Sequence, residues 1–481
     1  MLKALKKDAL VYTIPVIISR GMAIFLLPVY TRIASSSELG ALDLFLAFGN
    51  IVAFTVALEI SQGVARFIPE ISDSETRKIY GSSGLIFTFL TYLAFIFTCM
   101  IFSASLSFAI TGSMNFEPEF RLALIYIFLN GLFYYTQNLL RFVGKSAAFA
   151  FASVTYAVLN LGLTLYLGGI LGWGLSAIFV AFIGSTITAL ILTIFYLRDS
   201  LKLTLQLKAL KKLLRFSLPL VPAAVLVFLS LYIDRLMVSR LISLEASGLY
   251  SVGIRLASAS TLIMMGFQMA LTPLVYKHYK EASTRDALAK IFRYFVLLAL
   301  LFFIIYSLVI SEVLSVFTTE KYHGLTHIIP LLIMAFCFSQ MYVFMPGITI
   351  EKKTILILFI NFGIAFINVL LNLTLIPYFG LSGAAAATCA SAVVGFMGHS
   401  YLSQKFYHVQ HDWRLYVINL LFACFLIFMY FFYFSSNQIY VSVAVRLSIV
   451  IMFLVFARWT SLIHLQDVVQ IKNFLIKKAK G

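Results

Sequence analysis

Apolar runs of about twenty residues recur along the whole chain, and each is long enough to cross a bilayer core of roughly 30 Å as a helix. Fourteen such runs are present, at approximately residues 9–33, 40–61, 81–103, 122–140, 149–168, 173–196, 215–238, 248–271, 293–314, 327–347, 355–376, 381–403, 415–434 and 439–458. Only 11% of the residues are charged, against roughly a quarter in soluble proteins. These features predict an all-α integral membrane protein.

The positive charges indicate how the spans are oriented. With the N-terminus in the cytoplasm, 28 of the 36 Lys and Arg residues fall in cytoplasmic segments. Positive residues mark cytoplasmic loops, so we expect both termini inside. The net charge of +17 then reflects topology and gives no reason to expect nucleic acid. The first apolar run is followed by YTRIA and not by a small-residue cleavage site, so we expect it to stay as the first span.

The two halves of the chain match at a fixed offset of 208 residues. The matched residues are Arg32 with Arg240, Ser35 with Ser243, Gly40 with Gly248, Lys145 with Lys353, Asn160 with Asn368, and Gly172 with Gly380. Because one offset holds from Arg32 to Gly172, the sequence predicts a duplication, with six spans in each half. Repeats of the same topology are related by an axis along the membrane normal and place a central site between two lobes.

The repeat and the charge pattern divide the chain into four parts. We expect an N-lobe at residues 1–197, a basic amphipathic cytoplasmic linker at 198–214, a C-lobe at 215–405, and two added spans with a basic tail at 406–481. The linker pattern suits a helix on the anionic inner surface of the membrane.

Several arginines lie inside predicted spans, where a charged group is expensive unless it faces protein or a watered cavity, and three of them are candidates for a binding site. Arg20 is near mid-depth, Arg235 is in the outer third of its span, and Arg255 is about two turns below the outer rim. Arginine binds phosphate oxygens through a planar, permanently charged fork. We therefore interpret these three as candidates for a cavity that holds an anionic headgroup.

Three acids accompany them, Asp43, Glu59 and Asp234. They are candidates for ion or proton coupling, and Asp43 or Asp234 could equally pair with an arginine as a structural bridge between the lobes. Other polar residues inside predicted spans, among them Asn50, Asn160 and Asn368, suit interhelical hydrogen bonds or a cavity lining that contacts sugar.

Motifs for catalysis or metal binding are not found. The GKS at 144–146 lacks the first glycine of a phosphate loop, and the histidine pairs at 323 and 327 and at 408 and 411 lack further ligands. The cysteines lie far apart in apolar runs, which favours buried thiols. We expect no cofactor, no metal and no enzymatic activity, but a secondary transporter.

Several stretches resemble the multidrug, oligosaccharidyl-lipid and polysaccharide (MOP) exporter superfamily, specifically its bacterial polysaccharide flippase (Wzx-like) branch. They include SRGMAIFLLPVYTRIASSSELGALDLFLAF, EISQGVARFIPE, LYIDRLMVSRLISLEASGLYSVGIRLAS and PYFGLSGAAAATCAS. The resemblance covers nearly the whole chain, and Asp234–Arg235 followed by Ser-Gly-Leu-Tyr is its sharpest part.

The resemblance implies a V-shaped pair of six-helix lobes in the bacterial inner membrane that works by alternating access. It also implies a substrate, an undecaprenyl-pyrophosphate-linked oligosaccharide unit for O-antigen, capsule or exopolysaccharide. Further partners would be membrane lipids and the polysaccharide polymerase and chain-length machinery. A monomer is the expected state. The two added spans would cradle the isoprenoid tail.

Two other functions are open. A cation-coupled multidrug antiporter of the same superfamily would need one of the three acids to titrate or bind a cation. A membrane oligosaccharide polymerase or ligase would need a large catalytic outer loop, and the longest outer segment, about residues 102–121, is short.

Overall fold

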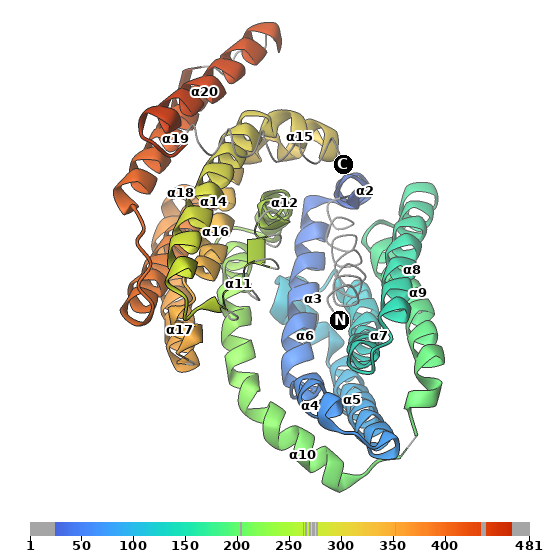
Figure 1. Cartoon of the computed structure of the whole chain (residues 1–481). Coiled ribbons are helices and arrows are strands. Elements are labelled where there is room, and N and C mark those ends of the chain that lie inside the picture. Colours follow the sequence, from blue (N-terminus) through green and yellow to red (C-terminus); the bar gives the residue numbers. More distant parts are fainter. Residues whose placement is uncertain are drawn as a thin grey trace, which may run out of the picture. The chain divides into compact units, whose positions relative to one another are not determined.

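Every regular element in the described part of the chain is a helix (Figure 1). The computed structural model describes residues 25–202, 204–262, 264, 267–268, 271, 275, 278–351, 353–433 and 439–463. Arg20 lies outside these residues. The helices are α2 (Leu27–Ile33), α3 (Ser36–Thr55), α4 (Ile60–Phe67), α5 (Ser74–Ile101), α6 (Ser103–Thr111), α7 (Glu117–Phe142), α8 (Ser146–Thr164), α9 (Gly174–Leu197), α10 (Leu207–Ser217), α11 (Val221–Leu241), α12 (Leu244–Ala257), α14 (Ala282–Leu308), α15 (Ile310–Phe317), α16 (Ile329–Gln340), α17 (Gly347–Ile350), α18 (Thr354–Phe406), α19 (Trp413–Tyr433) and α20 (Ile439–Trp459).

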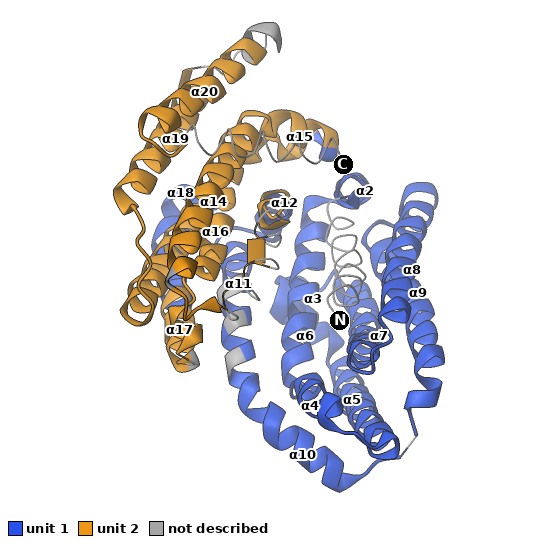
Figure 2. Cartoon of the chain, viewed as in Figure 1, with its two compact units in different colours: residues 1–255, 317–319, 365–384 blue, residues 256–316, 320–364, 385–481 orange. Residues whose placement is uncertain are grey.

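The chain groups into two compact units, coloured separately in Figure 2. Unit 1 contains residues 1–255, 317–319 and 365–384, and unit 2 contains residues 256–316, 320–364 and 385–481. The predicted lobes follow the repeat and not this clustering, and their boundaries stay a prediction.

Three helices agree closely with the predicted apolar runs, whereas α5 and α14 begin well before the runs at 81–103 and 293–314. The predicted spans at 173–196, 415–434 and 439–458 match α9, α19 and α20 to within two residues at each end. Seven helices in the described residues are long and apolar enough to cross a membrane, or eight with one bent pair counted as a span. The total of fourteen spans stays a prediction. The predicted span at 40–61 is broken, because α3 ends at Thr55 and α4 begins at Ile60.

Local backbone geometry repeats at the offset of 208 residues. Lys145 precedes α8 with φ −90° and ψ 58°, and Lys353 precedes α18 with φ −86° and ψ 50°. Each backbone N–H donates to the carbonyl five residues earlier, at 2.8 and 3.0 Å. Gly172 and Gly380 both have positive φ, at 70° and 55°, and Gly380 divides α18 into its two helical stretches.

A second pair of equivalent segments meets in space within unit 1. Ser35 accepts a hydrogen bond from Glu38 N at 3.2 Å, and Ser243 accepts one from Ala246 N at 3.0 Å, so both serines cap the helix that follows. Just beyond the caps, α3 and α12 cross at Gly40 and Gly248. The crossing thus joins residues that the repeat makes equivalent.

Small and hydroxyl-bearing residues hold α7, α8 and α9 together in unit 1. Phe133, Ala152 and Ala189 form a buried apolar cluster. The Thr136 and Thr193 hydroxyls share a hydrogen bond of 2.9 Å, and Gln137 donates to Ser153 at 2.7 Å. Small side chains let helices approach closely where the lipid provides little hydrophobic driving force between them.

In unit 2, thiols and an aromatic cluster pack the helices. All four cysteines of the chain are free: in unit 2, Cys389 is buried and Cys337 and Cys424 are half-buried, whereas Cys99 is buried in unit 1. At the start of α19, the His411 ring lies 4.7 Å from the Phe292 ring and 5.2 Å from the Trp413 ring, measured between centroids.

The buried position of His411 makes the stability of the protein sensitive to acid. Neither ring nitrogen has a hydrogen-bond partner among the described residues, and burial lowers the pKa of His411 to about 4. The unfolded chain takes up this proton near pH 6.5, so stability falls as the pH drops below that value towards 4. We expect His411→Phe to reduce the loss of stability between pH 7.5 and 4.5 by about 2–3 kcal/mol.

Thermal unfolding in detergent at the two pH values measures this effect. His323→Phe, in the segment before α16, is the matched control and should leave the acid sensitivity as it is in the wild type. Equal acid sensitivity in the wild type and in His411→Phe would show that the buried ring does not contribute.

Candidate functional site

Asp43 is the centre of a charged cluster inside unit 1. It lies two turns into α3, whose first turn is fixed by a capping box: Ser35 N donates to Glu38 at 2.7 Å in return for the bond to the Ser35 hydroxyl. Asp43 is buried, with 11% of its side chain exposed. A buried carboxylate requires a partner, and α11 and α12 each provide one.

Two arginines face this carboxylate. Arg235 Nε on α11 lies 3.1 Å from Asp43 Oδ2, and Arg255 Nη2 on α12 lies 3.5 Å from Oδ1. Arg235 is nearly as buried as Asp43, whereas Arg255 is more exposed, at 21% of its side chain. Both distances exceed the roughly 2.7–2.9 Å of a strong charge-assisted hydrogen bond. The contact is therefore a loose ion triad and not a bidentate fork.

Tyrosine rings complete the surroundings of the arginines. The Arg235 guanidinium lies over the Tyr232 ring, 4.4 Å from its centroid, and the Arg255 guanidinium lies 5.7 Å from the Tyr30 ring centroid. Asn50 donates to the Tyr232 hydroxyl at 3.3 Å. Cation–π contacts of this kind favour a guanidinium in a partly desolvated place.

Asp234 belongs to the same cluster but contacts different groups. One carboxylate oxygen accepts from the Tyr250 hydroxyl at 3.1 Å and the other from Arg235 N at 2.8 Å. Asp234 is 5% exposed. With Asp43, it balances the charges of Arg235 and Arg255, so this group of four ionisable residues is neutral when all are charged.

The structure therefore joins Asp43, Asp234, Arg235 and Arg255, and adds Asn50 through Tyr232. Asp43 lies beside both arginines, and its role as a structural bridge between the lobes or in ion coupling stays a prediction. The prediction that these arginines hold a headgroup is not tested by the structure.

The other predicted site residues lie elsewhere. Glu59 follows the end of α3, and the twelve residues from Asp43 to Thr55 alone span about 18 Å. Asn160 is buried in α8, and Asn368 is buried in α18, where it accepts from Asn372 at 2.8 Å. No group of three or more His, Cys, Asp or Glu among the described residues could hold a metal ion.

Sequence reasoning missed the tyrosines. Tyr232 precedes Arg235 by three residues, which places both on one face of a helix, and this spacing was an available signal. The contacts of Tyr30 with Arg255 and of Tyr250 with Asp234 join separate helices and have no local signal.

Comparisons with known proteins place the chain in a family. A family model described as polysaccharide biosynthesis protein matches residues 5–278, more than half of the chain. The chain belongs to the polysaccharide biosynthesis protein family. No curated protein matches the sequence.

Solved structures share the fold at low sequence identity. Lipid II flippase MurJ in an inward closed conformation matches with a TM-score of 0.72 and 16% identity, over 93% of this chain and 99% of that chain. An inward-facing multidrug resistance MATE family transporter of the MOP superfamily matches with 0.66 and 18%, over 83% and 97%. A variant of the Vibrio cholerae MATE transporter VcmN matches with 0.60 and 14%, over 84% and 97%. The chain thus shares the fold of these transporters, as the resemblance to the MOP exporter superfamily implied.

Proposed function

We propose that the protein is a flippase that moves an undecaprenyl-pyrophosphate-linked oligosaccharide from the inner to the outer leaflet of the bacterial inner membrane. Membership of the polysaccharide biosynthesis family supports a role with glycan precursors. The fold shared with a lipid II flippase and with MATE transporters supports transport by alternating access of two lobes. The proposal covers units for O-antigen, capsule or exopolysaccharide biosynthesis.

The observation that carries the proposal is the position of Asp43 between two guanidinium groups in an apolar bundle. A phosphate can occupy the same place, because it presents several oxygens to the same donors. The long distances at Asp43 leave room for a better anionic partner. Two buried arginines without any anion would be costly, so Asp43 keeps them paired when no substrate is bound.

Transport then follows as an exchange of anions. The pyrophosphate displaces the Asp43 carboxylate from Arg235 and Arg255 while the lobes are open to the cytoplasm, and rocking of the lobes exposes the headgroup to the outside. Release allows Asp43 to rejoin the arginines. The membrane potential, inside negative, favours expulsion of an anion by about 2.3 kcal/mol per charge per 100 mV. Asp43, Asp234 and Glu59 are the candidates for any proton or ion coupling.

The remaining parts of the chain fit this proposal. The lobes would be residues 1–197 and 215–405, joined by 198–214, with both termini in the cytoplasm. The added helices α19 and α20 would hold the isoprenoid tail, which has no reason to leave lipid. In unit 2, Arg446 on α20 pairs with Glu312 and donates to the Tyr430 hydroxyl at 2.8 Å, so its charge is matched within protein. The protein would act as a monomer, beside the polymerase and chain-length machinery.

Flipping in proteoliposomes tests the proposal. We load vesicles with an undecaprenyl-pyrophosphate-linked oligosaccharide and follow the accessibility of its sugar at the outer leaflet. Wild type should flip the lipid, and Arg235→Ala and Arg255→Ala should each lower the rate at least tenfold, since one buried charge-assisted contact is worth about 1.5–3 kcal/mol. Arg121→Ala, at an exposed surface ion pair with Glu117, is the control and should flip normally.

The outcomes separate the candidate functions. Normal flipping by both arginine variants would place the headgroup elsewhere. The second candidate is a cation-coupled antiporter, which the similarity to MATE transporters favours. Efflux of a cationic dye by the wild type, without flipping, would support it. Elongation of the glycan would support the polymerase or ligase reading.

A further inference from the structure

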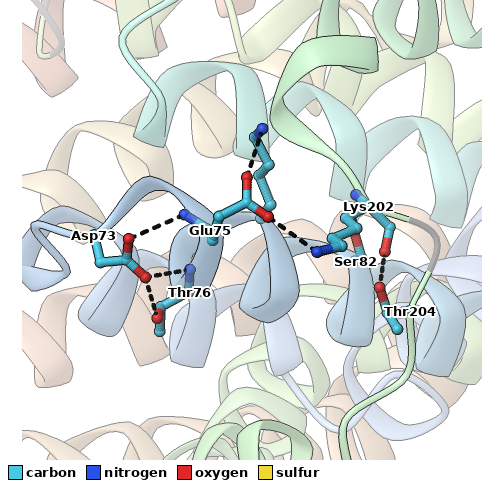
Figure 3. Close-up of polar contacts among 7 residues, drawn as sticks. Asp73, Glu75, Thr76, Ser82, Lys202 and Thr204 are labelled. Carbon is cyan, nitrogen blue, oxygen red and sulfur yellow. Dashed lines mark hydrogen bonds and ion pairs between the residues drawn. The ribbon is translucent and has the colours of Figure 1, made fainter.

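The segment that contains Lys202 and Gln206 joins the two halves of the chain and is hydrogen-bonded to the first turns of α5 (Figure 3). Lys202 N donates to Ser82 Oγ at 2.8 Å, and Gln206 N donates to Ser83 Oγ at 3.0 Å. Both serines are buried. The Lys202 ammonium lies 3.0 Å from Glu75, which also holds Lys78 at 3.0 Å. This segment therefore fixes the start of α10 on unit 1.

The apolar side of α10 is covered by protein. Ala209, Leu213 and Ser217 are buried at intervals of four residues, and α10 packs against α4 and α5. A Cβ atom added at Gly63 on α4 would lie 2.9 Å from the Leu213 carbonyl oxygen, which shows how close the two backbones come. The apolar side of the amphipathic helix α10 is therefore covered by other helices of unit 1. Only the opposite side of α10 is free to contact a partner.

That opposite side is basic. Lys208, Lys211 and Arg215 are exposed, and their spacing of three and four residues places them on one face. Among the described residues, none of the three has an ion pair. The neighbouring lysines differ: Lys202 pairs with Glu75, and Lys212 lies over the rings of Phe67 and Tyr80 at 4.7 and 5.7 Å. We call Lys208, Lys211 and Arg215 the basic face.

We infer that the basic face binds the headgroups of anionic phospholipids in the leaflet where α5 enters the membrane. The helix α10 packs against the beginning of α5, and α5 is apolar enough to span the membrane, with a mean hydropathy of 2.1. The basic face therefore lies near the boundary between water and lipid. Leu207 and Phe216, 73% and 38% exposed, flank the basic face and can contact the acyl boundary. Exposed apolar groups beside unpaired lysines suit a membrane surface better than a soluble acidic partner.

The contact has a structural consequence for the site. α10 continues through the turn Leu218–Leu220 into α11, which carries Asp234 and Arg235. Binding of lipid headgroups to α10 therefore fixes the depth in the membrane at which α11 begins. The contact is electrostatic, so it weakens as salt shortens the Debye length from about 10 Å at 0.1 M.

Fluorescence quenching in nanodiscs tests the inference without any transported substrate. The full chain carries an environment-sensitive dye on Leu205→Cys, 42% exposed and just before α10, with the four native cysteines replaced. Phosphatidylcholine nanodiscs receive the same fraction of brominated lipid, as phosphatidylglycerol or as phosphatidylcholine. Brominated phosphatidylglycerol should quench at least threefold more at 0.05 M salt, and the excess should vanish at 0.5 M.

The controls match the change in charge. Lys208→Gln, Lys211→Gln and Arg215→Gln together should abolish the excess quenching, because each basic residue near the surface contributes about fivefold to lipid partition. The control triple variant should keep the excess quenching. It changes three exposed positions of unit 2, Lys280→Gln, Arg285→Gln and Lys290→Gln. Equal quenching by the two lipids in wild type, or an excess that survives in the first triple variant, would overturn the inference. Replacing the basic face by glutamates should reverse the preference towards a brominated cationic lipid.

Discussion

Asp43→Ala is expected to lower the free energy of unfolding by about 3–5 kcal/mol, because it leaves two guanidinium groups in a low-dielectric place without their shared anion. Asp43 is the partner of both Arg235 and Arg255, so one substitution breaks two ion pairs. The midpoint of thermal unfolding in detergent measures the loss.

Two companion measurements identify the cause. Asp43→Ala combined with Arg255→Met should recover most of the lost stability, since the remaining charges of Asp234 and Arg235 then balance each other. Inorganic pyrophosphate should raise the unfolding midpoint of Asp43→Ala more than that of wild type, because the carboxylate no longer competes for the arginines. If Asp43→Ala alone is as stable as the wild type, the loose triad does not stabilise the fold.

Gly248→Ala should destabilise the protein by about 3 kcal/mol, the upper part of the range for overpacking. A Cβ atom there would overlap the Ser36 carbonyl oxygen on α3, and a Cβ at Gly40 would overlap the Leu244 carbonyl oxygen on α12. Backbone atoms cannot move aside as a flexible side chain can. The two helices would have to separate, so Gly40→Ala should have a similar effect.

The yield of monodisperse protein and the thermal midpoint measure this prediction. Gly162→Ala, within α8, is the matched control, because nothing lies within 4 Å of its added Cβ. In a helix interior that change should be neutral or stabilising by up to about 1 kcal/mol. Equal behaviour of Gly248→Ala and Gly162→Ala would mean that α3 and α12 do not meet at their glycines.

Much of the helical framework could be predicted from hydropathy. Apolar length defines a helix in lipid, where every backbone group needs an internal partner, and α9, α19 and α20 end within two residues of their predicted bounds. The repeat was visible partly because glycine is favoured where the backbone needs positive φ, as at Gly172 and Gly380. Lys145 and Lys353 keep the same conformation at the predicted offset.

The break after α3 had no such signal. Leu58 and Glu59 both adopt left-handed backbone, with φ of 49° and 52°. Residues other than glycine rarely do so, at a cost of order 1 kcal/mol or more each, and neither glycine nor proline stands at these two positions. Tertiary packing overrides local preference there, so an apolar run reads as a continuous span.

The charge cluster was predicted in part. Depth in the membrane identified Asp43, Arg235 and Arg255, because charges are costly at those levels. Sequence could not reveal that one carboxylate serves both arginines, since Asp43 and Arg255 are 212 residues apart. The same holds for α10, whose periodicity predicted a helix with an apolar side but not that unit 1 covers it.

The crossing of α3 and α12 has a consequence for the history of the chain. Gly40 faces Leu244, and Gly248 faces Ser36, so residues separated by 208 exchange the same contact in both directions. Such reciprocity is the mark of a self-complementary interface around a twofold axis. A half-length polypeptide in the membrane could make this contact with an identical copy of itself. Gene fusion would then have joined two subunits that already fitted, and later substitutions could place an acid on one side and arginines on the other.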